Sequence, residues 1–216
     1  MVASDAGMRT AIRKAQNTGV GMTTVRFSNH FGAASAYTLM ALEYGMAGIA
    51  MSNTDVVMGI PGARGAQIGN NPLSYAIPAG KHPALVLDIA MSTVAGGKVN
   101  SAKVRGKPIP EGWLTDGEGL PTTDPSVFLA EGALTPFAAH KGYGLAMLVE
   151  SFAGVLAGAG MTSDILSWAN ESASPCNEGH AFIAVDVATM MPSGQFAERI
   201  DELISRMKKA PKAKGS

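Results

Sequence analysis

The chain has 216 residues, 46% of them hydrophobic, and its 17 Lys and Arg residues balance its 17 Asp and Glu residues. This length allows one large domain with a sizeable core, and the balanced charge favours neither nucleic acid nor an acidic membrane surface. The single cysteine, Cys176, excludes an internal disulfide and Cys-rich zinc sites. We therefore expect no metal, and a reducing, cytoplasmic compartment, since no secretory signal is visible near Met1.

The first quarter of the chain shows alternating helix and strand signals. A helix is expected over residues 4–17, with Ser4 as its N-cap and a stop at Gly19. Its apolar face comprises Met8, Ala11, Ile12 and Ala15. Further along, we expect a strand at residues 23–27, a helix at 34–44 that Gly45 ends, and an apolar strand at 47–52.

The remaining elements are separated by long polar segments. A loop rich in Gly and Pro is expected over residues 53–72, and a mostly irregular but ordered segment over 105–136. Strands are expected at residues 73–78, 84–89 (buried) and 180–187, and helices at 94–104 and 139–159, the latter the longest. An amphipathic helix over residues 195–209 should turn inward Phe196, Ile200, Leu203, Ile204 and Met207.

These elements interleave without a regular βαβ rhythm, which predicts a mixed α/β fold with a largely antiparallel sheet flanked by helices. We expect a single domain over residues 1–209 and a disordered basic tail over 210–216. Residues 142–161 are long enough to span a membrane, but Gly and Ala dominate and cationic flanks are missing. A helix buried in a globular domain is the better interpretation.

The usual nucleotide-binding motifs are absent. Gly19-Val20-Gly21 lacks the third glycine of a dinucleotide fingerprint, and Gly97-Lys98 lacks the context of a phosphate-binding P-loop. The sequence therefore predicts neither a Rossmann domain nor a nucleoside triphosphatase.

His30 is the first candidate site residue. It follows Ser28 and Asn29 at a corner between the strand at residues 23–27 and the next helix, where rigid backbone presents a side chain to ligands. Imidazole can donate and accept protons near neutral pH. The alternative is a histidine that caps or packs a turn.

Three further segments carry polar groups suited to a ligand. Asn53-Thr54 and Asn70-Asn71 offer amides and backbone N–H groups, although they could equally be capped turns. Residues 88–93 place Asp88, Ser92 and Thr93 after a strand, where α/β folds bind ligands, or where they merely cap the next helix. His140-Lys141 puts a cation at a helix start, which calls for an anion, either a ligand phosphate or a protein carboxylate such as Glu150.

At these residues the chain resembles the type-2 malate/L-lactate dehydrogenase family, which includes ureidoglycolate and sulfolactate dehydrogenases and 2,3-diketogulonate reductase. The segments that carry the resemblance are residues 26–32, 69–72, 88–92 with Gly97-Lys98, 122–125 and 141–145. Their order and spacing agree over nearly the whole chain. The resemblance implies a non-Rossmann NAD(P)-binding fold, usually dimeric, that interconverts small 2-oxo and 2-hydroxy acids.

The resemblance also implies roles for individual residues. His30 matches the catalytic acid/base. The cofactor-binding candidates are Asn53, Thr54, Asp88, Ala90, Met91, Ser92, Thr93, His140 and Lys141, and the substrate-binding candidates are Ser28, Asn29 and Asn71. The cofactor would be NAD or NADP, and the partners a small 2-oxo or 2-hydroxy acid and a second copy of the chain.

Family members are typically longer, so the chain looks truncated at both ends, and the carboxylate clamp for substrate is not assignable. Two alternatives stay open. One is a catalytically incomplete fragment that only binds nucleotide or dimerises. The other is an unrelated hydrolase, although no Gly-x-Ser-x-Gly elbow supports it.

Overall fold

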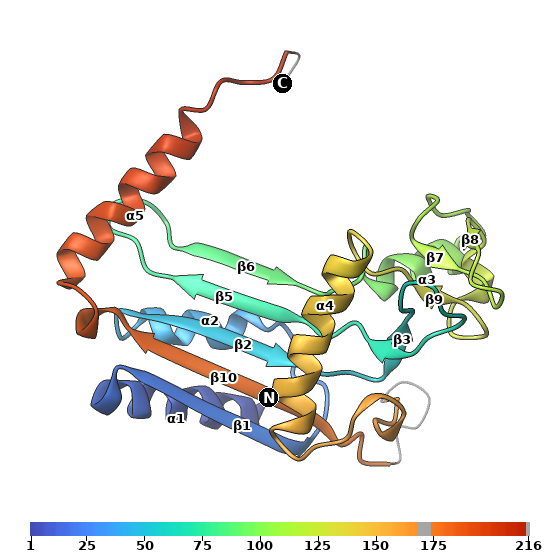
Figure 1. Ribbon diagram of the computed structural model, residues 1–216, viewed down its shortest axis with the longest axis horizontal. Coiled ribbons are helices and arrows are strands. Elements are labelled where there is room, and N and C mark those ends of the chain that lie inside the picture. The colour runs from blue at the N-terminus through green and yellow to red at the C-terminus, as the bar shows by residue number, and fades with distance from the viewer. Residues whose placement is uncertain (168–173, 215–216) are drawn as a thin grey trace.

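The computed structural model describes residues 1–167 and 174–214, and its largest feature is a five-stranded sheet (Figure 1). The spatial order is β1 (Val20–Ser28), β10 (Glu178–Asp186), β2 (Met46–Ser52), β5 (Leu73–Ile77) and β6 (Leu85–Ile89). Every neighbouring pair is antiparallel. The expected mixed α/β fold with a largely antiparallel sheet is therefore confirmed. β6, expected to be buried, is an edge strand whose Val86 is exposed.

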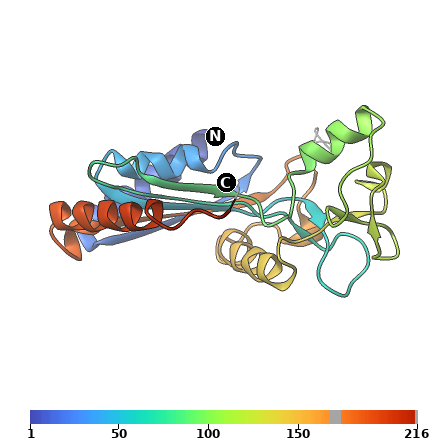
Figure 2. The ribbon, with the colours of Figure 1, turned by 90° about the horizontal axis from the view of Figure 1, so that it is seen from above.

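Two helices cover one face of this sheet, α1 (Val2–Thr18) and α2 (Ser35–Leu42), as Figure 2 shows. The expected face of α1 is fully buried against Phe182 of β10. Gly21 permits the close approach of α1 to β1, because a Cβ there would lie 1.9 Å from the Ala11 carbonyl oxygen. Ser4 is not the N-cap, since α1 begins at Val2 and buries Ser4 inside the helix.

A second, smaller sheet lies beside the first and has its own apolar cluster around Met58, Met91 and Leu134. Its order is β4 (Ile68–Gly69), β3 (Val56–Met58), β9 (Ala133–Leu134), β7 (Leu114–Thr115) and β8 (Pro121–Thr122), with α3 (Gly96–Val104) packed nearby. These strands lie in the segments expected to be irregular, residues 53–72 and 105–136. They are too short to show an alternating pattern, which explains the error.

On the opposite face, α4 (His140–Val149) continues as a π-helical segment over Glu150–Val155, and this segment packs against β1, β10 and β2 at one end of the large sheet (Figure 2). This helix is therefore shorter than α1 and is not the longest. Its outer face is exposed, so it is a surface helix packed on a sheet rather than a fully buried one. In the described part of the chain, no helix has both the length and the apolar character that a membrane span needs.

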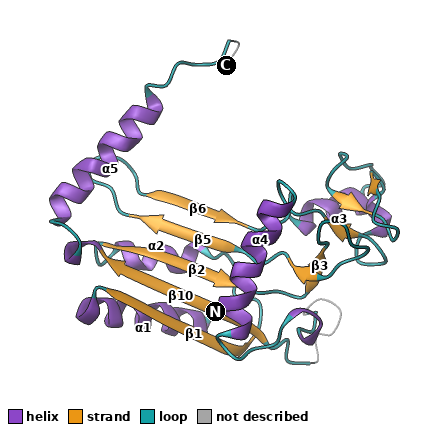
Figure 3. Cartoon of the chain, in the orientation of Figure 1, coloured by secondary structure: helices purple, strands orange, loops and turns teal. Residues whose placement is uncertain are grey.

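The last helix, α5 (Ser193–Lys208), passes the ends of β5 and β6 beside the turn that joins them, and then extends away from the sheet (Figure 3). Asp201 fastens it there by accepting hydrogen bonds from the backbone N–H groups of Gly80, Lys81 and His82. Ile204 is buried as expected, but Leu203 and Met207 are exposed, so the expected inward face is only partly correct. Residues 215–216 of the expected basic tail lie outside the described residues.

Candidate active site

A cavity of about 460 Å³ lies where the two sheets meet. His30, Thr54, Asp88 and Ala90, all singled out from the sequence, line its wall. His30 and Thr54 follow the ends of β1 and β2, and Asp88 and Ala90 lie at the end of β6. The C-terminal ends of three strands of the large sheet therefore bring these residues together. β3 and β9 of the small sheet supply Val57 and Leu134 on the other side. Asn70, from a segment that the sequence also indicated, lines the cavity too. The sequence did not indicate four further lining residues: Ser52, Asp55, Gly96 and Glu178.

The His30 corner is held by the residues on either side of it. The Asn29 Oδ1 atom accepts a hydrogen bond from the Cys176 N–H at 3.0 Å, and His30 Nδ1 accepts one from the Gly32 N–H at 3.2 Å. The Phe31 carbonyl accepts a hydrogen bond from the Tyr37 hydroxyl at 2.5 Å. These bonds fix the backbone on both sides of an exposed imidazole, which is the arrangement that a reactive side chain requires.

Strand β1 is irregular just before this corner. Its register against β10 shifts between Val25 and Ser28, and Phe27 has a φ of 56°, in the region that L residues rarely adopt. Bulges of this kind turn a strand and redirect the side chains that follow, here Ser28 and His30. Ser28 itself donates a long hydrogen bond, 3.4 Å, to the Asn29 carbonyl.

His180 is fully buried behind the corner and stacks on Phe31, with ring centroids 4.7 Å apart. Its Nδ1 atom lies 2.8 Å from Ser52 Oγ. Burial, together with the positive charge of the N-terminus, lowers the pKa of His180 to about 4. This imidazole is therefore neutral at physiological pH and serves as a packing surface for Phe31.

Glu178, at the start of β10, is a residue that sequence reasoning missed. It is 1% exposed and its Oε1 atom has no hydrogen-bond partner in the described part of the chain. Burial, and secondarily the charge of Asp55, raises its pKa to about 8. The only available signal was an acidic residue immediately before an apolar strand.

Asn53 and Asn71 do not line the cavity; both are fully buried around Glu150 of the π-helical segment. Asn71 Nδ2 donates to Glu150 Oε2 at 2.8 Å, and Asn53 Nδ2 donates to the Gly160 carbonyl at 2.8 Å. Glu150 Oε1 also accepts from the Thr162 N–H. These amides join α4 to the loops after β2 and β4. Thr54 does line the cavity, with its Oγ1 3.1 Å from the Asn70 side chain.

Residues 88–93 divide between two cavities. Asp88 lines the first and also accepts a hydrogen bond from the Ser35 N–H at the start of α2, 2.8 Å away. Thr93 lines a second cavity of about 230 Å³, walled by glycine-rich backbone of residues 59–63 and by Thr135. Met91 is buried in the core, and Ser92 donates to the Val94 carbonyl.

His140 and Lys141 are exposed at the start of α4 and line neither of these two cavities. The preceding residue, Ala139, lines the second cavity and has a φ of 53°. Lys141 forms no ion pair within residues 1–167 and 174–214. Glu150 is not its partner, since that carboxylate is bonded to the amide of Asn71 and the Thr162 N–H.

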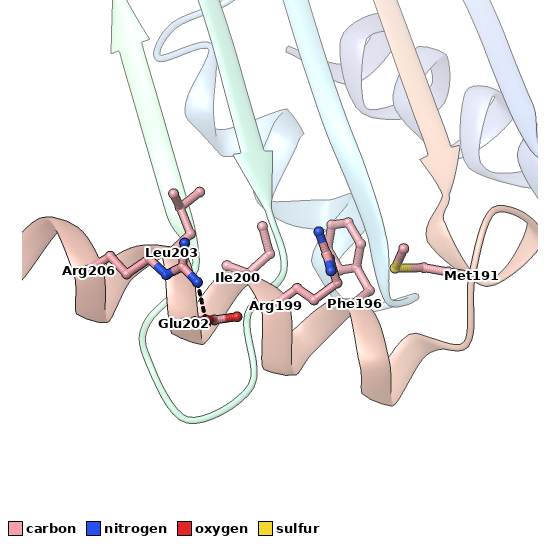
Figure 4. Close-up of a pocket in the computed structure, with 7 residues that line it drawn as sticks. All are labelled: Met191, Phe196, Arg199, Ile200, Glu202, Leu203 and Arg206. Atoms are coloured by element: carbon pink, nitrogen blue, oxygen red, sulfur yellow. Dashed lines mark hydrogen bonds and ion pairs between the residues drawn. The ribbon is translucent and has the colours of Figure 1, made fainter.

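A third cavity, of about 410 Å³, lies along α5 and contains none of the candidate residues (Figure 4). Met191, Phe196, Ile200 and Leu203 form its apolar lining, and an exposed Arg206–Glu202 ion pair borders it. We therefore place the candidate site in the first two cavities.

Comparison with known proteins gives a consistent result. The family model described as malate/L-lactate dehydrogenase matches residues 1–216. The L-sulfolactate dehydrogenase of Methanothermobacter thermautotrophicus is 39% identical over 201 residues, 93% of this chain and 58% of its own length. The solved sulfolactate dehydrogenase of Methanocaldococcus jannaschii has a TM-score of 0.90 at 36% identity, over 100% of this chain and 61% of that one.

Two further relatives carry cofactors in their names. The (2R)-3-sulfolactate dehydrogenase (NADP(+)) of Chromohalobacter salexigens is 35% identical over 93% of this chain and 60% of its own length. The ureidoglycolate dehydrogenase (NAD(+)) of Escherichia coli is 32% identical over 99% of this chain and 60% of its own length. The chain thus spans about three fifths of the length of the relatives it matches.

Proposed function

The chain belongs to the malate/L-lactate dehydrogenase family, and from this premise we propose that it is an NAD(P)-dependent oxidoreductase that interconverts a small 2-oxo acid and the corresponding 2-hydroxy acid. The observation that carries the proposal is His30, which is held at a strand end and lines the cavity between the two sheets. The relatives' names, which include sulfolactate and ureidoglycolate dehydrogenases, support this class of reaction.

The residues present fit a dinucleotide. A single segment, residues 88–95, borders both cavities, since Asp88 and Ala90 line the first and Thr93 lines the second. Glycine-rich backbone walls the second cavity and leaves room for a bulky group. Lys141, which forms no ion pair among the described residues, lies two residues after Ala139 of that wall. We assign the nicotinamide half to the first cavity and the phosphates to the second. The cofactor is NAD or NADP.

When bound, the reduced nicotinamide would supply a hydride to the carbonyl carbon of the oxo acid. The His30 imidazolium would give the proton that the substrate oxygen needs, and in the reverse direction the neutral ring would take it back. Asp88 and Thr54 would border the ligand, while Ser28 and Asn29 position the His30 corner. In the described part of the chain no Lys or Arg lines the first cavity, so a cation for the substrate carboxylate is not assigned.

We also propose a cytoplasmic homodimer that acts on small molecules and binds neither nucleic acid nor membrane. The second candidate is a catalytically incomplete protein that only binds nucleotide or dimerises. It is favoured by one observation, that among the described residues no Lys or Arg lines the first cavity to hold a substrate carboxylate.

The test has two steps. Titration with NADH and NADPH, followed by nicotinamide fluorescence, should show saturable binding of at least one of them. Oxidation of that cofactor is then measured with pyruvate, oxaloacetate and a cyclic imino acid. The absence of binding by either cofactor would overturn the proposal, and binding without turnover would favour the second candidate.

The role of His30 is tested in the same assay. His30→Ala should lower kcat at least about a hundredfold with little change in cofactor Kd, because general acid/base catalysis contributes on that order. His82→Ala is the matched control, since His82 lies in the β5–β6 turn, where Asp201 of α5 holds its backbone. A sharp rise in cofactor Kd with kcat preserved would instead make His30 a binding residue.

A further inference from the structure

The wall of the His30 cavity contains a second buried titratable group, the carboxyl of Glu178. Glu178 is the first residue of β10 and pairs with Ser28 of β1. Ser28 precedes His30 by two positions in the chain, so the β1–β10 pairing brings Glu178 close to the His30 corner. Glu178 and His30 line the same cavity. The side chain is 1% exposed, yet it borders open space that a ligand could fill.

This carboxyl lacks the partners that a buried acid normally has. Its Oε1 atom has no hydrogen-bond partner among the described residues, and a buried polar atom of this kind usually has one. No Lys or Arg lines the cavity within the described ranges. The titratable groups around it are Asp55 and Asp88 from the loop after β2 and the end of β6, His30 after β1, and His180 on its own strand.

Such surroundings disfavour a negative charge on Glu178. Burial, reinforced by the charge of Asp55, raises its pKa to about 8, so the carboxyl is mostly neutral at pH 7. A neutral carboxylic acid carries an O–H donor, whereas a carboxylate can only accept. The missing partner is therefore a hydrogen-bond acceptor.

Resting on the proposed function, we propose that Glu178 is a ligand-binding residue whose carboxyl O–H donates a hydrogen bond to a carbonyl oxygen of the molecule that fills the His30 cavity. Two molecules offer that chemistry, the carboxamide of the nicotinamide and the 2-oxo acid. Either would satisfy the buried carboxyl and hold the ligand in a fixed orientation beside His30.

A pH dependence follows from this role. Above about pH 8 Glu178 loses its proton, so the donor disappears and a further negative charge arises beside Asp55. Ligand binding should therefore weaken as the pH rises through this range. His180 contributes nothing to that change, because its pKa is about 4.

The experiment compares the wild type with Glu178→Gln, which keeps a donor but cannot ionise, and Glu178→Leu, which has no donor. The Kd for NADH or NADPH is measured by fluorescence between pH 6.5 and 9.5, and the KM for the oxo acid over the same range. Between pH 7 and 9.5 binding to the wild type should weaken about tenfold more than binding to Glu178→Gln. Glu178→Leu, which has no donor, should bind about tenfold more weakly than the wild type at pH 7. A change in Kd identifies the carboxamide as acceptor, and a change in KM alone identifies the oxo acid.

The matched control is Glu202→Gln, the same substitution at an exposed position of α5. Its Kd and KM should change with pH as those of the wild type do. If Glu178→Leu does not fold, the inference is tested by comparing the pH dependence of Kd and KM in the wild type and in Glu178→Gln. Kd and KM values that change with pH in the same way in those two proteins would overturn this inference while the proposed function stands. A wild type that binds neither cofactor would overturn the proposed function and this inference with it.

Discussion

At the scale of single residues, the site is defined by how its neighbours hold His30 rather than by the imidazole alone. Phe31 is stacked between Tyr37 and His180, and its carbonyl accepts a hydrogen bond from the Tyr37 hydroxyl. The Asn29 side chain accepts a hydrogen bond from the backbone N–H of Cys176. A side chain on such a support loses little entropy when it meets a ligand, because its backbone is already ordered.

Burial of His180 predicts a loss of stability in acid. Folding lowers the pKa of His180 from 6.5 to about 4. Between these two pH values the imidazole is mostly protonated in the unfolded chain and mostly neutral in the folded chain. The contribution of His180 to the free energy of unfolding should therefore decrease as the pH falls from 6.5 to 4, by on the order of a few kcal/mol. Glu178, whose pKa is raised to about 8, acts in the opposite direction over the same range, so the His180 contribution is measured as a difference between variants. Urea denaturation at several pH values measures it.

The comparison is with His180→Gln, which cannot titrate, and with His82→Gln as control, since His82 is only half-buried. The stability of His180→Gln relative to the wild type should rise as the pH falls from 6.5 to 4, and His82→Gln should follow the wild type. Parallel curves for the wild type and His180→Gln would contradict the assignment of a buried neutral imidazole.

At the scale of elements, α4 and its π-helical continuation join the two sheets. The wider turn begins at Glu150, whose carboxylate is bonded to the Asn71 amide and the Thr162 N–H. π-Helical turns frequently occur near functional sites, and this one fixes the loops that lead to Thr54 and Asn70 of the cavity wall. The other end of α4 presents Lys141 to solvent.

We predict that Lys141 contributes to cofactor binding and not to the stability of the folded protein. Lys141→Met should raise the dinucleotide Kd severalfold, because a cation near the second cavity would lose its contact with the ligand phosphates. The melting temperature without cofactor should stay unchanged, since Lys141 forms no ion pair among the described residues. Lys208→Met, on α5, is the control. A large drop in the melting temperature with Kd unchanged would show an internal partner instead.

At the scale of the whole molecule, the cavity exists only because two sheets with separate apolar clusters meet. Exposed apolar side chains lie on α4, on the π-helical segment and the residue after it, and on the far part of α5, among them Leu148, Val155, Leu156 and Met207. Apolar surface of this extent is typical of faces that pack against other protein.

We therefore predict that the 216-residue chain, expressed alone, self-associates and shows little turnover. Light scattering and sedimentation should give a mass above that of the monomer. Leu156→Lys, at a position where 61% of the side chain is exposed, should shift the distribution toward monomer, while Gln16→Lys on α1 should not. A well-behaved monomer with a kcat on the order of 10 s⁻¹ would contradict this prediction.

The sequence by itself determined the elements whose patterns are long and regular. The apolar face of α1, the strands of the large sheet and the stop at Gly19 all follow from periodicity and from the freedom of glycine at positive φ. His30 at a strand end was also predicted, since the corner is local in the chain. The strands of the small sheet were missed because two or three residues carry no period.

Only the tertiary structure decided which polar groups share a space. Asn53 and Asn71 look in sequence like Thr54 and Asn70, yet the first two are turned inward to Glu150 and the other two face the cavity. Glu178 shows the same point, because its neighbours His30 and Asp55 are distant in the chain and only sheet pairing brings them together. Burial and long-range neighbours set the pKa of such a group, and neither is encoded in a local pattern.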